Sequence, residues 1–381
     1  MNSTFVCPRC GNSSSRYIGY KNDLPYCRKC IEFQGATVEY EKKNPKQCSL
    51  RLNYHLSKEQ NSLSNKIISN YINKKDTLVY AVTGSGKTEI SYGVILYAIS
   101  HGQNVAFAVP RKDVVVELSE RLKSAFPLNS VISIYGGHTS KLSGDCLVLT
   151  THQLYRYDHY FDLIVMDEVD AFPFNGNDVL SAMFFRSLRG NFVLMSATPS
   201  KKLVQEIKKR DGLILTLHTR FHKKPIPVPN LLTMPLNLAK LFLVKKIQQY
   251  QRLNKPLFIF VPSVEMSESL FAFLSKFCKG GNYVSSKREG RDKIISLFKA
   301  GKYRFLVTTA VLERGVTVKD IQIIVFKADS KIYDSAALIQ IAGRAGRKID
   351  ATSGEVIFLG KKKTEAMENA KREIERCNRF L

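Results

Sequence analysis

Short apolar runs recur along the chain from residue 51 onward, with amphipathic stretches between them. In the first part of this region the runs fall at 77–82, 104–110, 146–151, 161–168 and 191–198. Unbroken runs of this length are typical of parallel strands that are buried on both faces of a sheet. The stretch 112–126 carries apolar residues at helical spacing, which indicates a helix between two such strands. The pattern therefore predicts an α/β fold built on parallel sheets.

The pattern is interrupted between residues 218 and 237, where four prolines occur, at positions 225, 227, 229 and 235. Proline lacks a backbone N–H group and fixes φ, so a regular helix or a central strand is not expected there. Apolar runs resume at 256–263, 304–311, 321–328 and 354–360, and a charged helix is expected at the C-terminal end. We therefore predict a first lobe at 51–217, a linker at 218–237 and a second lobe at 238–381.

The first 50 residues are polar and lack a long apolar period. They contain four cysteines in the pattern C-x2-C-x16-C-x2-C, namely Cys7, Cys10, Cys27 and Cys30. This spacing is typical of a tetrahedral zinc site with four thiolate ligands, and a redox pair or disulfides is the alternative. Metal binding would supply the folding free energy that this segment cannot obtain from an apolar core. Residues 1–50 are therefore predicted to form a zinc module, which contacts nucleic acid through its basic side chains or serves a structural or protein-docking role.

Composition adds a strong charge to this picture. Of the 381 residues, 58 are Lys or Arg and 33 are Asp or Glu, which gives a formal net charge of +25. Such a field attracts polyanions, either nucleic acid or an anionic membrane surface. The alternative is a generally basic protein without such a partner. The N-terminus lacks the pattern of a secretory signal, and the apolar runs are far shorter than the about 20 residues that span a bilayer. We therefore expect a soluble, cytoplasmic protein whose contact with a membrane would be peripheral.

The strand at 77–82 runs into "AVTGSGKT" (81–88), and a predicted helix follows. Glycines let the backbone wrap closely around oxyanions, while backbone amides and the helix N-terminus face the negative charge. Lys87 can reach the outer phosphates of ATP, and the Thr88 hydroxyl can bind Mg²⁺. A plain turn between a strand and a helix is the alternative. The ATP-binding residues predicted from this loop are Thr83, Gly84, Ser85, Gly86, Lys87 and Thr88.

A second buried strand ends in consecutive carboxylates, in "LIVMDEVD" (163–170). Asp167 can hold Mg²⁺, and Glu168 can orient or deprotonate the attacking water. Helix capping is the alternative role for such acids. The 80 residues between Lys87 and Asp167 leave room for two βα units. Together the loop and the carboxylates predict hydrolysis of ATP rather than binding alone.

A third cluster, "QIAGRAGR" (340–347), carries Arg344 and Arg347 among small residues. Their spacing would place both on one face of a helix. Guanidinium groups are suited to the γ-phosphate in transfer, although two solvated surface arginines would show the same spacing. If these arginines come from the second lobe, the nucleotide lies in a cleft between lobes, and its binding and hydrolysis would close and open them.

Seven segments in order resemble the motifs of superfamily-2 helicases: "AVTGSGKT", "VPR", "TTHQL", "DEVD", "SAT", "TTAVLERGVTV" and "QIAGRAGR". The resemblance covers residues 51–381 and implies two RecA-like lobes. It implies that Gln60 and Gln340 contact ATP and that Ser196 and Thr198 couple ATP to nucleic acid. The residues implied to contact the strand or both ligands are Arg111, Thr151, Thr308 and Arg314. Phosphate contacts do not read sequence, so we expect salt-sensitive binding of single strands with little base preference.

A four-cysteine module in front of such a motor resembles the ComFA family of late-competence ATPases from naturally transformable Gram-positive bacteria. This resemblance implies a cytosolic, membrane-associated ATPase that is stimulated by single-stranded DNA and helps draw transforming DNA through the ComEC channel. It implies ATP, Mg²⁺ and Zn²⁺ as cofactors and ComFC as a protein partner.

Two alternatives stay open from the sequence. One is a duplex-unwinding helicase of replication restart or repair, because PriA also couples such a motor to cysteine-bound zinc, although its zinc module is inserted within the motor. The other is a zinc-bearing DNA-binding adaptor whose nucleotide site serves as a switch.

Overall fold

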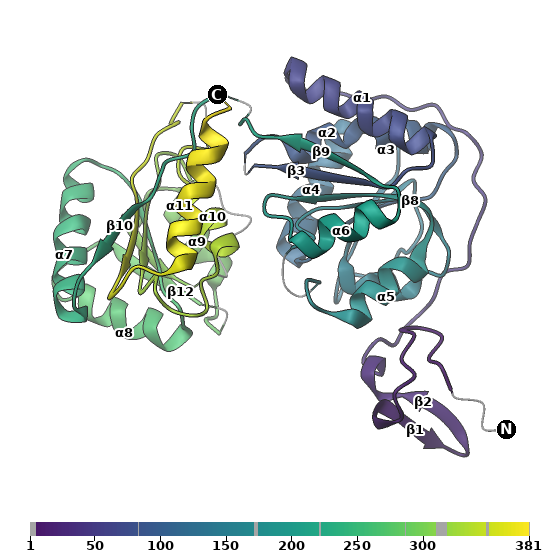
Figure 1. The fold of residues 1–381 in the computed structure, drawn as a ribbon, viewed down its shortest axis with the longest axis horizontal. Coiled ribbons are helices and arrows are strands. Elements are labelled where there is room, and N and C mark those ends of the chain that lie inside the picture. Colours follow the sequence, from purple (N-terminus) through teal and green to yellow (C-terminus); the bar gives the residue numbers. More distant parts are fainter. Residues whose placement is uncertain are drawn as a thin grey trace. The chain divides into compact units, whose positions relative to one another are not determined.

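The computed structural model describes residues 5–82, 84–170, 174–220, 222–285, 287–309, 318–347 and 350–380. The chain divides into two compact units. The first comprises Met1–Ala81 and Gly86–Leu217, and the second comprises Val82–Ser85 and His218–Leu381. Each unit is built around one parallel sheet, and the first also carries a small two-stranded module near the N-terminus (Figure 1).

The first sheet has the strand order β5-β6-β4-β7-β8-β3-β9, and every pairing is parallel. Its strands are β3 (Thr77–Ala81), β4 (Val105–Val109), β5 (Val131–Ile134), β6 (Cys146–Thr150), β7 (Phe161–Met166), β8 (Leu188–Ser196) and β9 (Leu213–Leu217). The helices are α1 (Lys58–Ile72), α2 (Lys87–Ile90), α3 (Tyr92–Ser100), α4 (Lys112–Ala125), α5 (Asp178–Ser187) and α6 (Lys201–Lys209), with the 3₁₀ helix η3 (Thr151–Arg156). The fold class predicted from the apolar pattern is confirmed.

Both faces of this sheet are buried, which explains why its strands are continuously apolar. Successive side chains of a strand point to opposite faces. Val79 accordingly packs in the core on one face, whereas Leu78 packs in the core on the other. In β4 the same alternation separates Phe107 from Ala106 and Ala108. Helices must cover both faces, as βα crossovers require.

The second unit repeats this architecture with the strand order β10-β15-β14-β11-β13-β12, again parallel throughout. Its strands are β10 (Asn230–Thr233), β11 (Leu257–Phe260), β12 (Gly281–Val284), β13 (Phe305–Thr308), β14 (Gln322–Phe326) and β15 (Val356–Gly360). The helices are α7 (Leu236–Arg252), α8 (Val264–Leu274), α9 (Arg291–Lys299), α10 (Ser335–Ala342) and α11 (Glu365–Asn378). Phe258 and Ile259 point into separate cores on the two faces.

The proline-rich segment contains more regular structure than the sequence suggests. Asn230–Thr233 form the edge strand β10, which pairs with β15 alone, and α7 begins at Leu236 directly after Pro235. The prolines flank the strand and do not interrupt it, and an edge strand needs hydrogen bonds on one side only. The second unit thus begins at His218, within the segment 218–237 that we expected to be a linker.

The N-terminal module consists of η1 (Ser15–Tyr17), β1 (Ile18–Lys21), β2 (Leu24–Cys27) and η2 (Arg28–Cys30). Asn22 and Asp23 join the antiparallel strands with φ angles of 49° and 58°, as expected for a two-residue hairpin turn.

The following segment, residues 34–52, is here named the strap because it runs along the first unit without regular structure. Asn104 donates a hydrogen bond to the carbonyl of Glu41 over 2.9 Å, and Lys46 pairs with Asp145 over 2.7 Å. Asn104 and Asp145 immediately precede β4 and β6. Residues 41–46 of the strap therefore cross the amino ends of these strands.

Within the part of the chain that the structure describes, no helix has both the length and the apolar character needed to cross a bilayer.

Asp145 should contribute measurably to the attachment of the strap. Its side chain is only 7% exposed, and it accepts hydrogen bonds from Lys46 and from the backbone N–H of Ser130. Burial opposes its charged form, but these donors outweigh burial and hold the pKa of Asp145 below its ordinary value. The Asp145→Asn substitution should lower the free energy of unfolding at pH 7 by about 1–3 kcal/mol, measured by urea denaturation.

The pH dependence follows from the lowered pKa. A carboxylate stabilised in the folded state contributes fully above its unfolded pKa of about 4, and the contribution is lost as the pH falls through the folded pKa. The difference between wild type and Asp145→Asn should therefore shrink under acidic conditions. Asp211, whose side chain is 89% exposed in its pair with Lys75, is the matched control. An Asp211→Asn effect as large as that of Asp145→Asn would contradict the prediction.

Candidate active site and metal centre

The predicted functional residues of the first unit follow the carboxyl ends of its strands. Parallel strands open their carboxyl ends at one edge of the sheet, where ligands bind in open α/β folds. One half of this edge, the phosphate half, comprises the adjacent ends of β7, β8 and β3 with residues 84–88, 167–170 and 196–198. The other half, the η3 half, comprises the ends of β4 and β6 with Arg111 and η3.

In the phosphate half, Lys87 and Asp167 form an ion pair. Lys87 Nζ lies 3.7 Å from Asp167 Oδ1, and the two side chains are 12% and 17% exposed. Asp167 is held in place because its backbone N–H donates to Ala108 and its Oδ1 accepts from the backbone N–H of Glu168. The fold thus brings together the lysine and the carboxylate that the sequence predicts for phosphate and Mg²⁺. A carboxylate beside a lysine and a threonine hydroxyl suits Mg²⁺ bound together with a phosphate chain.

The phosphate loop depends on two glycines in the left-handed region, Gly84 at φ +82° and Gly86 at φ +78°. A Cβ atom on Gly86 would lie 2.4 Å from Gln60 Nε2, so the loop can contact the Gln60 amide only through a glycine. Gln60 also forms a capping box with Ser57 at the start of α1. Gln60, predicted to recognise adenine, therefore lies directly against the loop, whereas Thr83 lies outside the described residues.

A hydrogen bond joins the two motifs that follow β7 and β8. The Thr198 hydroxyl donates to Asp170 Oδ2 over 2.7 Å, and the backbone N–H of Thr198 donates to Ser196 Oγ over 2.9 Å. Glu168, between the two aspartates, has a φ of +57°, which is unusual for a residue with a side chain. Such conformations cost free energy in a residue with a branched or long side chain. The Thr198–Asp170 hydrogen bond therefore links the carboxylate motif directly to the "SAT" segment.

The residues predicted to contact a nucleic-acid strand differ in accessibility. Arg111 is partly exposed and makes a two-pronged ion pair with Asp113, with Nη2 and Oδ2 2.9 Å apart. Thr151 and Thr308, in contrast, are completely buried, and the Thr308 hydroxyl donates to the carbonyl of Thr309. In this structure neither threonine presents its hydroxyl to solvent, unlike the direct contact expected from the sequence. Arg314 lies outside the described residues.

In the second unit, Arg344 and Arg347 do not share a helix face. The helix α10, which carries the buried Gln340, ends at Ala342, and both arginines follow it. Gly343 forms the C-cap, and Gly346 has a φ of +65°, so the chain turns where the spacing predicted a continuing helix. Arg344 is only 2% exposed, and Arg347 Nε donates to the carbonyl of Gly343 over 3.0 Å.

Sequence reasoning missed Arg220, which holds this turn in place. Its Nη1 donates to the carbonyls of Ala345 and Gly346 over 2.9 and 2.8 Å, and its Nη2 donates to that of Gly343 over 2.9 Å. Arg220 is 2% exposed, and burial together with the nearby charge of Arg347 lowers its pKa. A single arginine beside a proline-rich stretch gives no sequence signal for this role.

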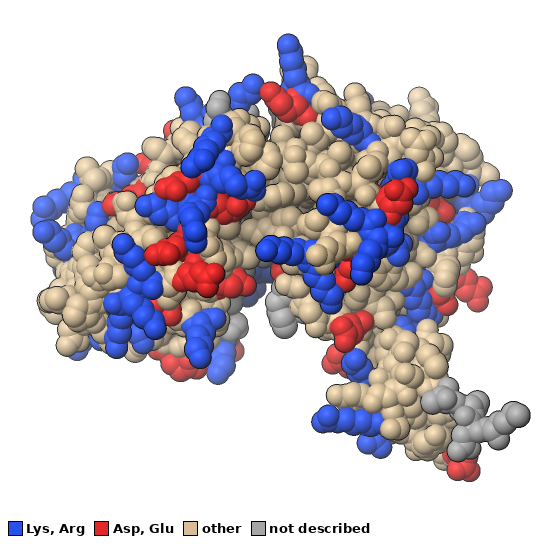
Figure 2. Space-filling model, in the orientation of Figure 1, with Lys and Arg blue, Asp and Glu red and all other residues tan. Residues whose placement is uncertain are grey.

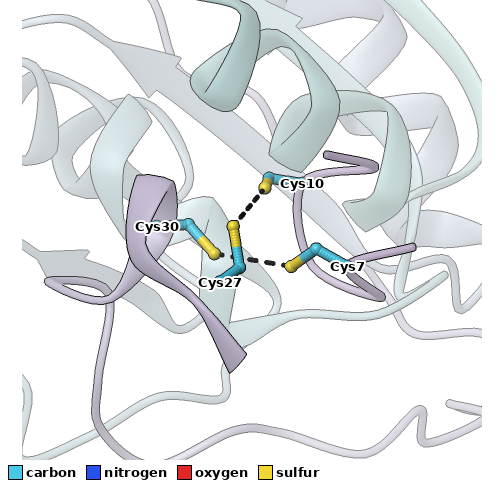
Figure 3. A group of neighbouring side chains, drawn as sticks. All are labelled: Cys7, Cys10, Cys27 and Cys30. Carbon is cyan, nitrogen blue, oxygen red and sulfur yellow. Dashed lines mark hydrogen bonds between the residues drawn. The ribbon is translucent and has the colours of Figure 1, made fainter. Parts of the chain in front are cut away.

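The four predicted zinc ligands gather at one point (Figure 3). All four sulfur atoms lie within 4.8 Å of one another, with Cys7 and Cys30 3.6 Å apart and Cys10 and Cys27 3.7 Å apart. Four thiolates around zinc at the usual bond length would be separated by about 3.8 Å, so the cluster fits this ion. Burial raises the pKa of Cys10 to about 11 and also raises that of Cys30. Binding of zinc must therefore displace protons from these thiols.

The module has almost no apolar core of its own. Its buried hydrophobic residues are Cys7, Cys27, Cys30 and Phe33, and they share one cluster with side chains of the first unit. The partners in that cluster are Tyr155 of η3 and Val179, Leu180 and Met183 of α5. The buried part of the module therefore consists of the sulfur cluster and its contact with α5 and η3.

Comparison with known proteins agrees with this architecture. Residues 61–207 match the DEAD/DEAH box helicase family, and residues 239–348 match the helicase conserved C-terminal domain. The structure of Saccharomyces cerevisiae Dbp5 bound to RNA and ADP BeF3 superposes with a TM-score of 0.63 at 16% identity, over 86% of this chain and 92% of that chain. A structure of the DUF1998 helicase MrfA bound to DNA gives a TM-score of 0.59 at 15% identity, over 91% of this chain and 54% of that chain. The protein is an ATP-hydrolysing enzyme of the helicase type with two RecA-like lobes.

Two curated relatives extend along nearly the whole chain. Competence protein ComFA of Bacillus subtilis is 35% identical over 98% of this chain and 86% of its own length. Competence protein ComFA of Streptococcus pneumoniae is 30% identical over 98% of this chain and 90% of its own length. The chain belongs to the ComFA family, as its motifs indicated. Replication restart protein PriA of Rickettsia prowazekii is 30% identical over 44% of this chain and 28% of its own length.

Replacing Cys7 and Cys10 together with serine should remove bound metal. The wild type should hold about one zinc ion per chain, and the double variant close to none, as measured by elemental analysis of the purified protein. Protease sensitivity of residues 5–33 should rise, because the sulfur cluster forms most of the buried part of this segment. Acidification should release zinc from the wild type, because protons compete for the thiolates. Cys48→Ser, outside the cluster, is the control, and unchanged zinc in the double variant would contradict the four-thiolate site.

Replacing Arg220 with methionine should loosen the turn at 343–347. Three backbone carbonyls would lose their donor, at a cost of about 1–3 kcal/mol in the stability of the second unit. The maximal rate of ATP hydrolysis should fall, because the turn that Arg220 supports carries Arg344 and Arg347. Arg220→Lys should fall between wild type and Arg220→Met, because an ammonium donates to carbonyls without the planar fork. A normal rate in Arg220→Met would show that the turn needs no such support.

Proposed function

We propose that this protein is a single-stranded-DNA-stimulated ATPase and translocase that helps drive transforming DNA into the cytoplasm during natural competence. The observation that carries the proposal is the combination, in one chain, of a four-cysteine cluster with two RecA-like lobes. This combination aligns with the ComFA relatives over 98% of the chain. The two-lobe motor alone would fit many helicases.

ATP would bind at the loop formed by residues 83–88, with Lys87 on its outer phosphates and Gln60 and Gln340 as further contacts. Thr88 and Asp167 would hold Mg²⁺, which when bound neutralises charge on the phosphates. Glu168 would orient the attacking water and accept its proton. Arg344 and Arg347 would act on the γ-phosphate, where guanidinium groups stabilise developing charge. ATP binding would break the Lys87–Asp167 ion pair. The phosphates would then neutralise Lys87, and Mg²⁺ would neutralise Asp167.

Single-stranded DNA would bind mainly through its phosphates. Figure 2 shows Lys and Arg side chains spread over the visible surfaces of both units, and the formal net charge is +25. Arg111 and Thr198 are the accessible candidates, while Thr151, Ser196, Thr308 and Arg314 complete the proposed coupling set. Binding should be strongly salt-dependent, because it releases counterions. Little base preference is expected from such contacts.

The finer biological setting is likewise a proposal. By analogy with the ComFA family, ComFC and the ComEC channel are the proposed partners, and the protein would act in the cytoplasm at the inner face of the membrane. The four cysteines would hold Zn²⁺. In this proposal residues 51–217 bind ATP, residues 238–381 supply the arginines, and residues 1–50 form the zinc module.

Duplex unwinding in replication restart is the second candidate, because PriA of Rickettsia prowazekii matches 44% of the chain at 30% identity. Strand displacement on a forked duplex distinguishes the two functions. A translocase for DNA uptake should show little displacement under conditions where a single strand stimulates ATP hydrolysis. Efficient displacement would favour the helicase.

The central experiment measures steady-state ATP hydrolysis with and without single-stranded DNA at several salt concentrations. We expect stimulation of roughly tenfold or more at low salt, declining as salt weakens the phosphate contacts. Lys87→Ala should abolish turnover in both conditions without unfolding the chain, which shows that the rate belongs to this site. Poly(dT) and mixed-sequence DNA should stimulate alike. The absence of stimulation at every salt concentration would reject the proposed function.

A further inference from the structure

The segment that follows the second cysteine pair lies directly against η3. Phe33 stacks on His152 with ring centroids 6.1 Å apart and an interplanar angle of 20°, and it also contacts Tyr155 at 5.8 Å. The Tyr155 hydroxyl donates to the carbonyl of Gln34 over 2.6 Å. We name residues 33–38 the clamp, because they hold η3 from the side of the zinc module.

Further along, the clamp is tied to the last turn of η3. Arg156 Nη1 donates to the carbonyl of Ala36 over 2.7 Å, while its Nε donates to Gln153 Oε1 within η3. The backbone N–H of Val38 donates to the carbonyl of Arg156 over 2.8 Å, and Val38 pairs with Tyr157 as an isolated bridge. Backbone and side-chain contacts therefore fix the same segment, and Arg156 is almost completely buried between its partners.

Gly35 makes this close approach possible. Its φ is +144°, and a Cβ atom there would lie 2.6 Å from the Tyr155 hydroxyl and 2.8 Å from Arg156 Nη1. Both of these atoms donate hydrogen bonds to the clamp itself. An alanine could be accommodated only if these side chains leave their acceptors or the clamp moves away from η3. Gly35 thus offers a way to loosen the contact without changing η3 or the zinc ligands.

The clamp acts on only one half of the sheet edge. η3 follows β6, and β4 separates β6 from β7, the strand that leads to Asp167. The clamp therefore supports the η3 half, with "TTHQL" and the neighbouring Arg111, and not the phosphate half. Phe33 belongs to the same buried cluster as Cys7, Cys27 and Cys30, so the metal-binding fold determines where the clamp lies.

We propose that the zinc module acts through the clamp as a positioning element for the DNA-binding half of the first lobe. Phe33 and Gly35 are positioning residues in this view, because they act through η3 and do not touch the reacting groups. A fixed η3 needs no further ordering when a strand binds, which favours affinity. The inference rests on the proposed function, since it assigns DNA binding to the η3 half. The alternative to this proposal is that the β1–β2 hairpin, whose Tyr20 is 69% exposed, binds DNA directly.

The test compares Gly35→Ala and Phe33→Ala with wild type in the full, zinc-loaded chain. Hydrogen exchange of the amides at 151–156 should accelerate in both variants, while zinc content and DNA-independent ATP hydrolysis stay within about twofold of wild type. The Kd for fluorescent oligo(dT), measured by anisotropy, should rise roughly three- to tenfold, because binding would then have to order side chains of a loosened η3. Phe33→Leu should restore most of the affinity, because it keeps an apolar side chain in the cluster, and it also serves if Phe33→Ala does not fold.

Two controls separate the alternatives. Gly301→Ala also places a side chain on a glycine of positive φ, +76°, but its Cβ would have no atom within 4 Å, so DNA affinity should not change. Tyr20→Ala removes an exposed ring of the module without touching the clamp. A rise in Kd for Tyr20→Ala but not for Gly35→Ala would show that the module binds DNA directly, which overturns the proposal.

The remaining outcomes are equally decisive. An unchanged or tighter Kd despite faster exchange at 151–156 would overturn the positioning role. If the rates of DNA-independent and DNA-stimulated ATP hydrolysis fall equally in the clamp variants, the positioning role is also overturned. The clamp would then support the whole lobe and not its DNA-binding half. Failure of the wild type itself to bind oligo(dT) would reject the proposed function, and this result is known before any variant is compared.

Discussion

The ion pair between Lys87 and Asp167 is the central contact of the predicted nucleotide site. The two residues are 80 positions apart and follow strands that are not neighbours, because β8 lies between β3 and β7. They meet because a parallel sheet brings the carboxyl ends of all its strands to one edge. Both charges are largely buried, so each requires an opposite charge nearby. A phosphate chain with Mg²⁺ can replace each partner in turn, which makes this pair suited to an ATPase.

The second unit uses a different arrangement to hold its charged groups. The hydrogen bonds of the buried Arg220 described in the structure all go to backbone carbonyl oxygens of the turn at 343–346. Gly346 must be a glycine there, because a Cβ atom would lie 2.4 Å from the carbonyl oxygen of Thr352. One buried guanidinium thus fixes the backbone from which Arg344 and Arg347 project. Side chains on a loop keep a reproducible position only when the backbone beneath them is held in this way.

The sequence predicted the elements that depend on local patterns and missed those that depend on distant contacts. The run at 77–82 became β3, and the cysteine spacing predicted the sulfur cluster, because burial and metal geometry impose regular patterns on the chain. The helix expected to continue through Arg347 ends at Ala342, and the chain turns away at Gly346, whose φ is +65°. Arg220 and Gly35 carry no local signal at all. Their roles arise only when segments more than 100 residues apart in sequence meet.

The small size of the N-terminal module explains why it must be docked. A segment of this length cannot bury enough apolar surface to fold alone, and metal ligation is the usual substitute. Here the sulfur cluster continues directly into an apolar contact with α5 and η3, so the metal site and the docking surface share the same buried side chains. A module that only displayed basic residues to DNA would not need Phe33 stacked on His152 or a glycine at position 35. The four cysteine sulfur atoms and the contact with η3 therefore belong to one buried cluster.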